Sequence, residues 1–515
     1  MTFLPLDLAA APGRHLLRGL RPDERHLARL LVSQAEALGD KPALRMGDTT
    51  ITYADLPRLA AAGRDRLLAA GVNPGERVCT LAANSVQLVQ IFLGCAVTGA
   101  IYVPLDPRLP DEELSERIAA VEPAAIYADK PIDDQLPMAT DEPLLGADLY
   151  AEASYDGTLP GLILHTSGTT GRPKGVLCPH SQLFSWAIFG NEQLGVTPDD
   201  VLYTNLPLFH CNALVTVTQS WVAGATAVVG TEFDVGLFWA QLAEYEATIT
   251  FLLGSMIHQL VSRSAEIPPP DDHRLRLVLA PGAGSDAKRR FTEWSDVLVV
   301  DAFGMTELNV VSYEPLDRIV SGSMGVPFPD FEIRVADGYD VPVPDGTVGQ
   351  LLVRPRSPFI TALGYWNAPQ ETMNAWRNLW FHTGDLVAWE PDGSLRYVDR
   401  LADAIHRGGH TISSREIEAV LQSHPAVLEC AVYGVPAGVG DDDILAAVRL
   451  VPGTRVGADE LSGFATRELA AGLVPDYVYV VDELPHTANG KIAKAALRSQ
   501  GAPDGRDTPQ RVVTS

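Results

Sequence analysis

The sequence is poor in cysteine, in recognisable hydrolase motifs and in long apolar runs. Its five cysteines lie far apart with no C-x-x-C pair, which argues against a disulfide framework and a structural zinc site. Neither a G-x-S-x-G elbow nor an H-E-x-x-H pair occurs, which disfavours serine-hydrolase and metalloprotease chemistry. The most apolar run, 92–105, is interrupted by two glycines and is shorter than the about 20 residues that a membrane span needs. The beginning of the chain carries early acidic residues and repeated arginines, unlike a secretory signal. These absences predict a cytoplasmic protein.

Positive charge is also scarce. The 515 residues include 39 Lys and Arg against 65 Asp and Glu, for a formal net charge of −26. Such a surface repels phosphate backbones and anionic headgroups, so we expect neither nucleic acid nor a membrane as partner. A single anionic ligand in a locally basic or amide-lined pocket stays compatible with this charge. The hydrophobic fraction of 46% is that of a globular protein with an ample core.

Along most of the chain, short β-branched runs alternate with longer amphipathic segments. The strand-like run 77–83 precedes the helix-like run 85–100, and 247–254 and 276–284 are each followed by a helical pattern. This alternation is typical of parallel sheets covered by helices, whose ligands bind beyond the carboxyl ends of the strands. We therefore predict an α/β fold with a large N-terminal domain of helix-covered parallel sheets over residues 1–400.

The composition changes near residue 320 and again near residue 400. From 320 to 400, glycine, proline and aspartate separate short strands, which predicts a small β subdomain of antiparallel strands. Beyond 400, Ser413, Ser414 and Glu416 resemble the cap of an amphipathic helix, and strand patterns follow. We expect a small α+β C-terminal domain over 401–500 and a disordered tail over 501–515.

The segment LILHTSGTTGRPKGV, residues 162–176, has the composition of a phosphate-binding loop. A β-branched strand leads into hydroxyl residues, interleaved glycines and Lys174. Glycines let successive backbone N–H groups turn inward on a phosphate, hydroxyls add donors, and a lysine adds positive charge. The segment is not a Walker A loop, because no G-K-[ST] occurs at the required spacing. An ordinary surface turn is the competing interpretation, which the density of small, hydroxylated and basic residues disfavours.

Five further residues have side chains suited to nucleotide chemistry. Thr306 can donate to a phosphate oxygen, and Glu307 is a hard oxygen ligand for Mg²⁺ bridging ATP phosphates. Asp385 offers two oxygens to ribose hydroxyls, and Arg400 can support the same ribose or the α-phosphate. Lys491 supplies positive charge late in the chain. Taken singly, these residues have ordinary alternatives: a helix-terminal acid, an Asx turn or a solvated surface charge.

These segments resemble the motifs of the acyl-adenylate-forming superfamily, which comprises acyl-CoA synthetases, nonribosomal-peptide adenylation domains and firefly luciferases. The resemblance covers roughly residues 30 to 498, and the motifs occur in the superfamily's order. They are ITYADL (51–56) with GAIYVPLDP (99–107), TSGTTGRPKG (166–175), LPLFHCNAL (206–214), APGAG (280–284), DAFGMTE (301–307), FHTGDL (381–386), DRLADAIHRGGHTISSREIE (399–418) and LPHTANGKIAK (484–494). Residues 206–260 look most like acyl-CoA ligases of the crotonobetaine/carnitine–CoA ligase type.

The resemblance implies a role for each matching residue. Four residues are implied to be catalytic, with Glu307 also the Mg²⁺ ligand and His210 a gate at the carboxylate pocket: Lys491, Thr306, Glu307 and His210. Asn212 and Met256 are implied to line the acyl pocket, and Gly408 and Gly409 the CoA side. The residues implied to bind ATP or AMP are Thr166, Ser167, Gly168, Thr169, Thr170, Gly171, Lys174, Gly282, Ala283, Gly284, Asp301, Phe303, Gly304, Met305, Asp385 and Arg400.

The implied activity is that of an ATP-dependent acid–thiol ligase. It forms acyl-AMP with release of pyrophosphate, after which the small C-terminal domain, which is mobile, rotates and the acyl group passes to CoA. The implied cofactors are ATP, Mg²⁺ and CoA, and the implied substrate is a small-molecule carboxylic acid; a homodimer is left open. Two alternatives stand beside this one. The acceptor is an amine, a carrier-protein thiol or nitrite, as in ATP-dependent diazotases, or the protein binds nucleotide without catalysis.

Three positions depart from the superfamily pattern. Ala402 stands at the hinge where Lys or Asp is usual, His410 replaces a Glu, and Phe303 replaces a Tyr. Ala402 keeps the backbone pivot but removes a polar anchor. The sequence therefore leaves open how easily the C-terminal domain rotates.

Overall fold

The computed structural model describes residues 19–129, 136–137, 145–146, 156–166, 174–319, 322–408, 410–437, 441–486, 492–500 and 510–511. The chain divides into two compact units. The first contains the described parts of 1–166, 174–332 and 354–376, and the second contains those of 333–353 and 377–515. In the described part of the chain, no helix has both the length and the apolar character that crossing a membrane requires.

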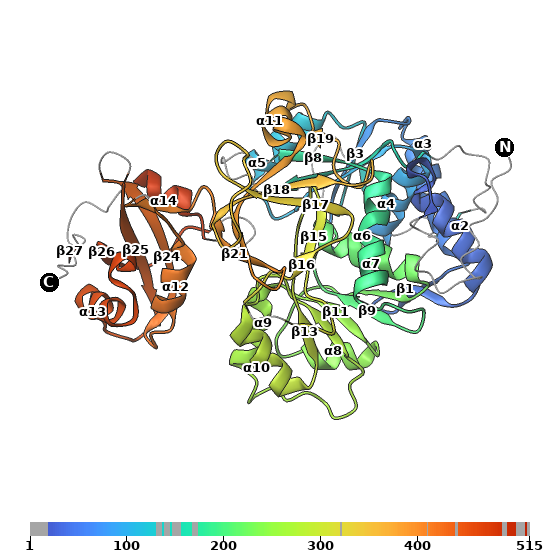
Figure 1. Cartoon of the computed structure of the whole chain (residues 1–515). Coiled ribbons are helices and arrows are strands. Elements are labelled where there is room, and N and C mark those ends of the chain that lie inside the picture. Colours follow the sequence, from blue (N-terminus) through green and yellow to red (C-terminus); the bar gives the residue numbers. More distant parts are fainter. Residues whose placement is uncertain are drawn as a thin grey trace. The chain divides into compact units, whose positions relative to one another are not determined.

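The first unit is built on two seven-stranded sheets (Figure 1). The strand order of one is β13 (Leu298–Val300), β12 (Leu277–Leu279), β11 (Ile249–Phe251), β9 (Val201–Thr204), β10 (Thr226–Val229), β1 (Pro42–Met46) and β2 (Thr49–Thr52). The order of the other is β19 (Gly364–Tyr365), β8 (Lys174–Pro179), β7 (Pro160–Thr166), β4 (Ile101–Pro104), β3 (Arg77–Leu81), β5 (Ala125–Ala128) and β6 (Leu136–Pro137). Pairing is parallel except where β2, β8 and β19 join. The predicted parallel sheets are confirmed.

Helices cover both faces of each sheet. One core joins side chains of both sheets to those of α2 (Leu27–Leu38), α3 (Leu56–Ala69), α4 (Val86–Thr98), α6 (His180–Gln193) and α7 (Cys211–Ala223). The other face of the first sheet packs on α8 (Phe238–Glu244), α9 (Gly254–Ser262) and α10 (Ser285–Ser295). The other face of the second sheet packs on α5 (Asp111–Val121).

The helix α4 shows how local sequence sets these elements. Ser85 caps its start by accepting from the N–H of Leu88 at 3.2 Å, and left-handed Gly99 ends it. Gly63 on α3 lies against α4 so closely that an added Cβ would be 2.1 Å from the carbonyl oxygen of Gln90. Two helices can approach this closely only where side chains are missing, which explains the glycine in the middle of α3.

Smaller sheets follow. The strands β14 (Ala302–Met305), β15 (Asn309–Tyr313) and β16 (Val326–Pro327) form an antiparallel sheet. A four-stranded sheet has the order β17 (Phe331–Ala336), β18 (Gly349–Pro355), β20 (Phe381–Trp389) and β21 (Leu395–Arg400). This confirms the predicted β subdomain. The division between the two units falls within β17, within β18 and after residue 376, so β20 and β21 belong to the second unit.

The C-terminal part is α+β, as predicted. A hairpin of β22 (Ile405–Arg407) and β23 (His410–Ile412) precedes α12 (Ser414–Gln422), whose cap is Ser413. The sheet β24 (Val427–Pro436), β25 (Asp442–Leu450), β26 (Tyr477–Val481) and β27 (Gln510–Arg511) packs on α12 and α13 (Ala458–Glu468), while α14 (Lys494–Gln500) covers its other face. The short strand β27 lies within the segment 501–515, for which disorder is expected. Short 3₁₀ turns occur at Pro22–Glu24, Arg377–Leu379 and Ala471–Leu473, and α11 spans Pro369–Ala375.

Candidate functional site

Thr306 and Glu307 occupy the turn between β14 and β15 in the first unit. Glu307 is 8% exposed, and its carboxylate oxygen Oε1 accepts a hydrogen bond from the hydroxyl of Tyr365 at 2.8 Å. Its backbone carbonyl accepts from the N–H of Ala362 at 2.8 Å. The position in a strand–strand turn excludes the alternative that Glu307 is merely an acid at a helix N-terminus.

The neighbouring Thr306 is linked to two helices. Its carbonyl accepts from the amide of Gln182 on α6 at 2.8 Å, and its hydroxyl donates to the sulfur of Cys211 at 3.8 Å. Cys211 is the first residue of α7, directly after His210 and before Asn212. The structure therefore places the turn of Thr306 beside the helix start that carries the predicted gate and acyl-pocket residues.

Lys174 and Thr166 are cross-strand partners at the ends of β8 and β7. They flank the predicted phosphate loop, whose residues Ser167, Gly168, Thr169, Thr170 and Gly171 lie outside the described residues. The Lys174 ammonium lies 5.1 Å from the centre of the Tyr365 ring, within the range of a cation–π contact. The same tyrosine thus contacts both Lys174 and Glu307.

The glycine-rich loop 280–284 is held by Asp301. Both carboxylate oxygens of Asp301 lie 3.2 and 3.3 Å from the backbone nitrogen of Gly282. The Asp301 N–H in turn donates to Glu314 at 2.8 Å, and Glu314 pairs with Lys288 at 2.7 Å. Burial raises the pKa of the Asp301 carboxyl to about 6, with Lys288 opposing the shift. Asp301 therefore couples two segments that were both predicted to bind nucleotide, 280–284 and 301–305.

His210 is the N-cap residue of α7, and its ring packs on that of Phe209 with centres 4.8 Å apart. Burial lowers its pKa, with the charges of Asp106 and Arg108 acting in opposite senses, so the ring is neutral at pH 7. The buried amide oxygen of Asn212 makes no hydrogen bond to any residue that the structure describes. Met256 lies in the first turn of α9. This turn packs closely against the 280–284 loop, because an added Cβ on Gly254 would be 2.6 Å from the carbonyl oxygen of Gly282.

In the second unit, Asp385 on β20 and Arg400 on β21 are cross-strand partners. The guanidinium Nε of Arg400 lies 3.0 Å from Oδ1 of Asp385, which also accepts from the hydroxyl of Tyr397 at 3.1 Å. The side chain of Asp385 is 0% exposed and that of Arg400 is 36% exposed. Burial, and next the charge of Asp385, raise the pKa of Tyr397, so its hydroxyl is protonated and donates. Asp385 is thus part of an ion-pair network and not an Asx-turn residue.

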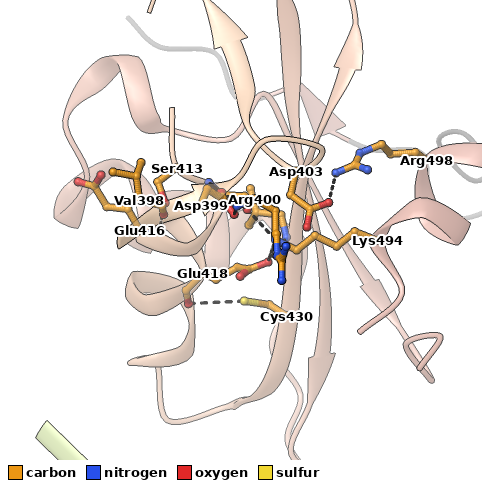
Figure 2. A network of polar contacts seen from close by, with 12 residues as sticks. Val398, Asp399, Arg400, Asp403, Ser413, Glu416, Glu418, Cys430, Lys494 and Arg498 are labelled. Carbon is orange, nitrogen blue, oxygen red and sulfur yellow. Dashed lines mark hydrogen bonds and ion pairs between the residues drawn. The ribbon is translucent and has the colours of Figure 1, made fainter. Parts of the chain in front are cut away.

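Polar contacts organise the segment after Arg400 (Figure 2). Asp399 accepts from both the N–H and the hydroxyl of Ser414, at 2.6 and 2.7 Å. Asp403 pairs with Arg498. Lys494 pairs with Glu418 at 2.7 Å, although burial still raises the pKa of that carboxyl. The side chain of Ala402 is exposed in the turn between these contacts.

The two remaining groups of predicted site residues are described only in part. Gly408 has φ +58° and donates its N–H to Asp441 at 2.7 Å, whereas Gly409 lies outside the described residues. Lys491 also lies outside them. His410, which replaces a Glu of the superfamily pattern, begins β23 and is exposed.

Sequence reasoning missed several residues that hold the predicted ones in place. They are Tyr365, Gln182, Cys211, Lys288, Glu314 and Tyr397. Alternation along β21 would not have found Tyr397, because residues three apart on a strand point to opposite faces; the β20–β21 register shifts between Leu386 and Val387, and the Tyr397 hydroxyl reaches Asp385. Nothing in the spacing brings Tyr365 to Glu307, 58 residues away in the chain.

The chain is similar to families and proteins that are already known. The chain matches the family of AMP-binding enzymes over residues 31–366 and the C-terminal domain of AMP-binding enzymes over 416–491. It is 33% identical to a feruloyl-CoA synthase of an Amycolatopsis species, covering 88% of this chain and 95% of that protein. It is 29% identical to a crotonobetaine/carnitine–CoA ligase of Salmonella paratyphi A, covering 90% and 97%.

Solved structures are similar as well. ATP-bound MatB from Rhodopseudomonas palustris superposes with a TM-score of 0.83 at 26% identity, covering 92% of this chain and 98% of that one. The O-succinylbenzoate CoA synthetase from Bacillus subtilis in complex with AMP has a TM-score of 0.81 at 25% identity, covering 93% and 98%.

Proposed function

Because the chain belongs to the AMP-binding enzyme family, we propose that Thr306 and Lys174 bind the phosphates of MgATP, that Glu307 binds its Mg²⁺ and that the start of α7 binds the acid. The activity class predicted from the sequence is confirmed: an ATP-dependent acid–thiol ligase that forms an acyl-adenylate and transfers the acyl group to CoA. The resemblance to crotonobetaine/carnitine–CoA ligases is confirmed too. The observation that carries the site proposal is the fixed carboxylate of Glu307 beside Thr306.

The donor set suits Mg²⁺ held jointly with a substrate. Among the described residues, no group of three or more His, Cys, Asp or Glu side chains could hold a metal alone. Mg²⁺ usually takes one or two carboxylates and completes its shell with phosphate oxygens and water, so a single glutamate beside a phosphate site is sufficient. When bound, the metal neutralises charge on the phosphates of ATP. Glu307 is the residue that would hold it.

The adenylation step brings a substrate carboxylate to the α-phosphorus of ATP. An oxygen of the carboxylate forms the new bond, and pyrophosphate leaves with the electrons of the broken bond. Two anions approach each other, so the protein must supply positive charge and oriented donors in a site with little water. We assign these roles to Lys491, Lys174 and the hydroxyl of Thr306. No protein nucleophile is required.

We propose that Asp385 and Arg400 contact the ribose and the α-phosphate. The loop Gly282–Gly284 and residues 301–305 are proposed to contact the rest of the nucleotide. The support is geometric: Asp385 is held by Arg400 and Tyr397, and Asp301 holds Gly282. Asp385→Ala should raise the KM for ATP and leave the KM for the acid unchanged. Unchanged saturation by ATP would contradict the ribose assignment.

The acid is proposed to carry a hydrogen-bond donor. The amide oxygen of Asn212 is buried and makes no hydrogen bond within the described part of the chain, so a bare alkyl chain would leave a buried acceptor unsatisfied. A pyrophosphate-release screen over alkyl acids and their hydroxyl- or amino-substituted counterparts tests this. Substituted acids should be preferred in the wild-type protein, and Asn212→Leu should abolish the preference. Equal rates for both classes would contradict it.

The acceptor assignment is tested in the same screen by mass spectrometry with and without CoA. A thioester that forms only with CoA is expected, whereas an amide, a carrier-bound product or a diazo product would point to one of the alternative acceptors. We further propose a cytoplasmic location, which five unpaired cysteines support, and a small C-terminal domain that begins near residue 400 and pivots at the exposed Ala402.

A further inference from the structure

We propose that Tyr365 is a positioning residue that aims the carboxylate of Glu307 at the metal and supports the ammonium of Lys174 at the phosphates. This rests on the proposed roles of Glu307 and Lys174. The tyrosine touches both groups: its hydroxyl donates to Glu307 at 2.8 Å, and the centre of its ring lies 5.1 Å from the Lys174 nitrogen. A single side chain therefore fixes the spacing between an anion and a cation that act on the same phosphates.

Tyr365 is itself held from several sides. Its N–H donates to the hydroxyl of Thr372 on α11 at 2.9 Å, and its ring packs edge-on against Trp376 with centres 5.7 Å apart. The preceding Gly364 has φ +140°, and an added Cβ would lie 2.8 Å from a methyl group of Thr372. Only glycine permits this approach, so the backbone at Tyr365 has little freedom.

The segment around Tyr365 joins two elements of the site by backbone bonds. The N–H of Ala362 donates to the carbonyl of Glu307 at 2.8 Å, and the N–H of Trp366 donates to the carbonyl of Gly175 at 2.7 Å. Residues 362–366 thus tie the Glu307 turn to the strand that begins at Lys174. A variant that lacks only the tyrosine hydroxyl should keep these backbone hydrogen bonds. Such a variant therefore tests the orientation of the Glu307 carboxylate without disturbing the fold of residues 362–366.

Outer hydrogen bonds to a metal-binding carboxylate fix its orientation, and their loss typically costs about 10–100-fold in metal affinity. Tyr365→Phe should therefore weaken Mn²⁺ binding, measured by electron paramagnetic resonance on protein saturated with α,β-methylene-ATP, by about tenfold or more. Its affinity for the analogue without metal should stay within about twofold, because the ring still faces Lys174. Tyr365→Leu removes the ring too and should also weaken metal-free analogue binding by about two- to fivefold.

Tyr53→Phe is the matched control. The hydroxyl of Tyr53 donates to the carbonyl of Ala225 at 2.6 Å, in the core and away from Glu307. Losing it should lower the melting temperature and leave Mn²⁺ affinity unchanged. Glu307→Gln distinguishes the metal role of Glu307 from the positioning role of Tyr365. In a protein that already carries Glu307→Gln, adding Tyr365→Phe should cause no further loss of Mn²⁺ affinity.

The outcomes are distinct. If Glu307→Gln weakens Mn²⁺ binding and Tyr365→Phe does not, the positioning role is wrong while the metal role of Glu307 stands. If Tyr365→Phe weakens binding equally with and without Glu307, its hydroxyl does not act through that carboxylate, and the inference is overturned. If Glu307→Gln leaves Mn²⁺ affinity unchanged, the proposed metal role of Glu307 itself fails.

Discussion

The guanidinium of Arg400 lies across the β20–β21 pair from Asp385, with Nε 3.0 Å from a carboxylate that has no exposed surface. Removing the cation leaves a buried carboxylate without its charged partner. Because Arg400 is itself partly exposed, we expect Arg400→Ala to lower the free energy of unfolding by about 1–3 kcal/mol. Urea unfolding measures this change.

Arg396 on the same strand provides the control. The side chains of Arg396 and its partner Glu390 are 45% and 35% exposed, whereas that of Asp385 is 0% exposed, so Arg396→Ala should cost less than about 1 kcal/mol. Equal losses in the two variants would show that burial of Asp385 does not strengthen its dependence on Arg400.

Lys491 is predicted to act in adenylation and not in transfer. Lys491→Ala should slow acid-dependent ATP–pyrophosphate exchange by about a hundredfold or more, because a preorganised transition-state donor is lost. Thioester formation from a supplied acyl-adenylate should be largely spared. Lys494→Ala is the matched control, since that lysine pairs with Glu418 and Ser414 and should affect stability instead. Normal exchange in Lys491→Ala would refute the role.

The order of strands and helices could be predicted from the sequence because it depends on local patterns of residues. Runs such as 77–83 and 85–100 become β3 and α4, since hydrophobic periodicity and caps such as Ser85 act over a few residues. The collinear motifs likewise predicted a fold and an activity class that the comparisons confirm.

Contacts between distant segments could not be predicted in this way. Tyr365 reaches Glu307 because β19 adds to the edge of the second sheet, a pairing that no local pattern encodes. Similarly, Lys288 and Glu314 look like surface charges on amphipathic segments, yet they are 6% and 1% exposed. The position of such a pair depends on how α10 packs against β15 and the residues after it.

The buried pair of Lys288 and Glu314 is predicted to support the Gly282 loop through Asp301. Lys288→Met leaves Glu314 buried without its cation, which should cost about 3–5 kcal/mol of unfolding free energy. Adding Glu314→Gln keeps an acceptor for the Asp301 N–H without the charge, and should recover much of that loss. If the double variant is no more stable than Lys288→Met, the cost does not come from the uncompensated carboxylate.

Acid should destabilise the first unit through a buried histidine pair. The rings of His26 and His180 lie 4.2 Å apart. Burial lowers the pKa of both, that of His180 to about 4. A lowered pKa in the folded state means that the stability is present above the ordinary value of about 6.5 and is lost as the pH falls toward 4.

For His180 alone, the loss between pH 7 and pH 5 should be about 2 kcal/mol. His180→Phe, which cannot take up a proton, should show a smaller fall in melting temperature over this range in scanning calorimetry. A fall as large as that of the wild-type protein would place the acid-sensitive group elsewhere.

The attack of the substrate carboxylate on the α-phosphorus is tested most directly by isotope transfer. An active acid from the screen is labelled with ¹⁸O in its carboxylate and incubated with ATP, Mg²⁺ and CoA, and the AMP is analysed by mass spectrometry. Because the thiol later cleaves the bond to the carbonyl carbon, AMP should keep one carboxylate oxygen and carry one ¹⁸O atom. Unlabelled AMP, or label recovered in inorganic phosphate, would contradict the account.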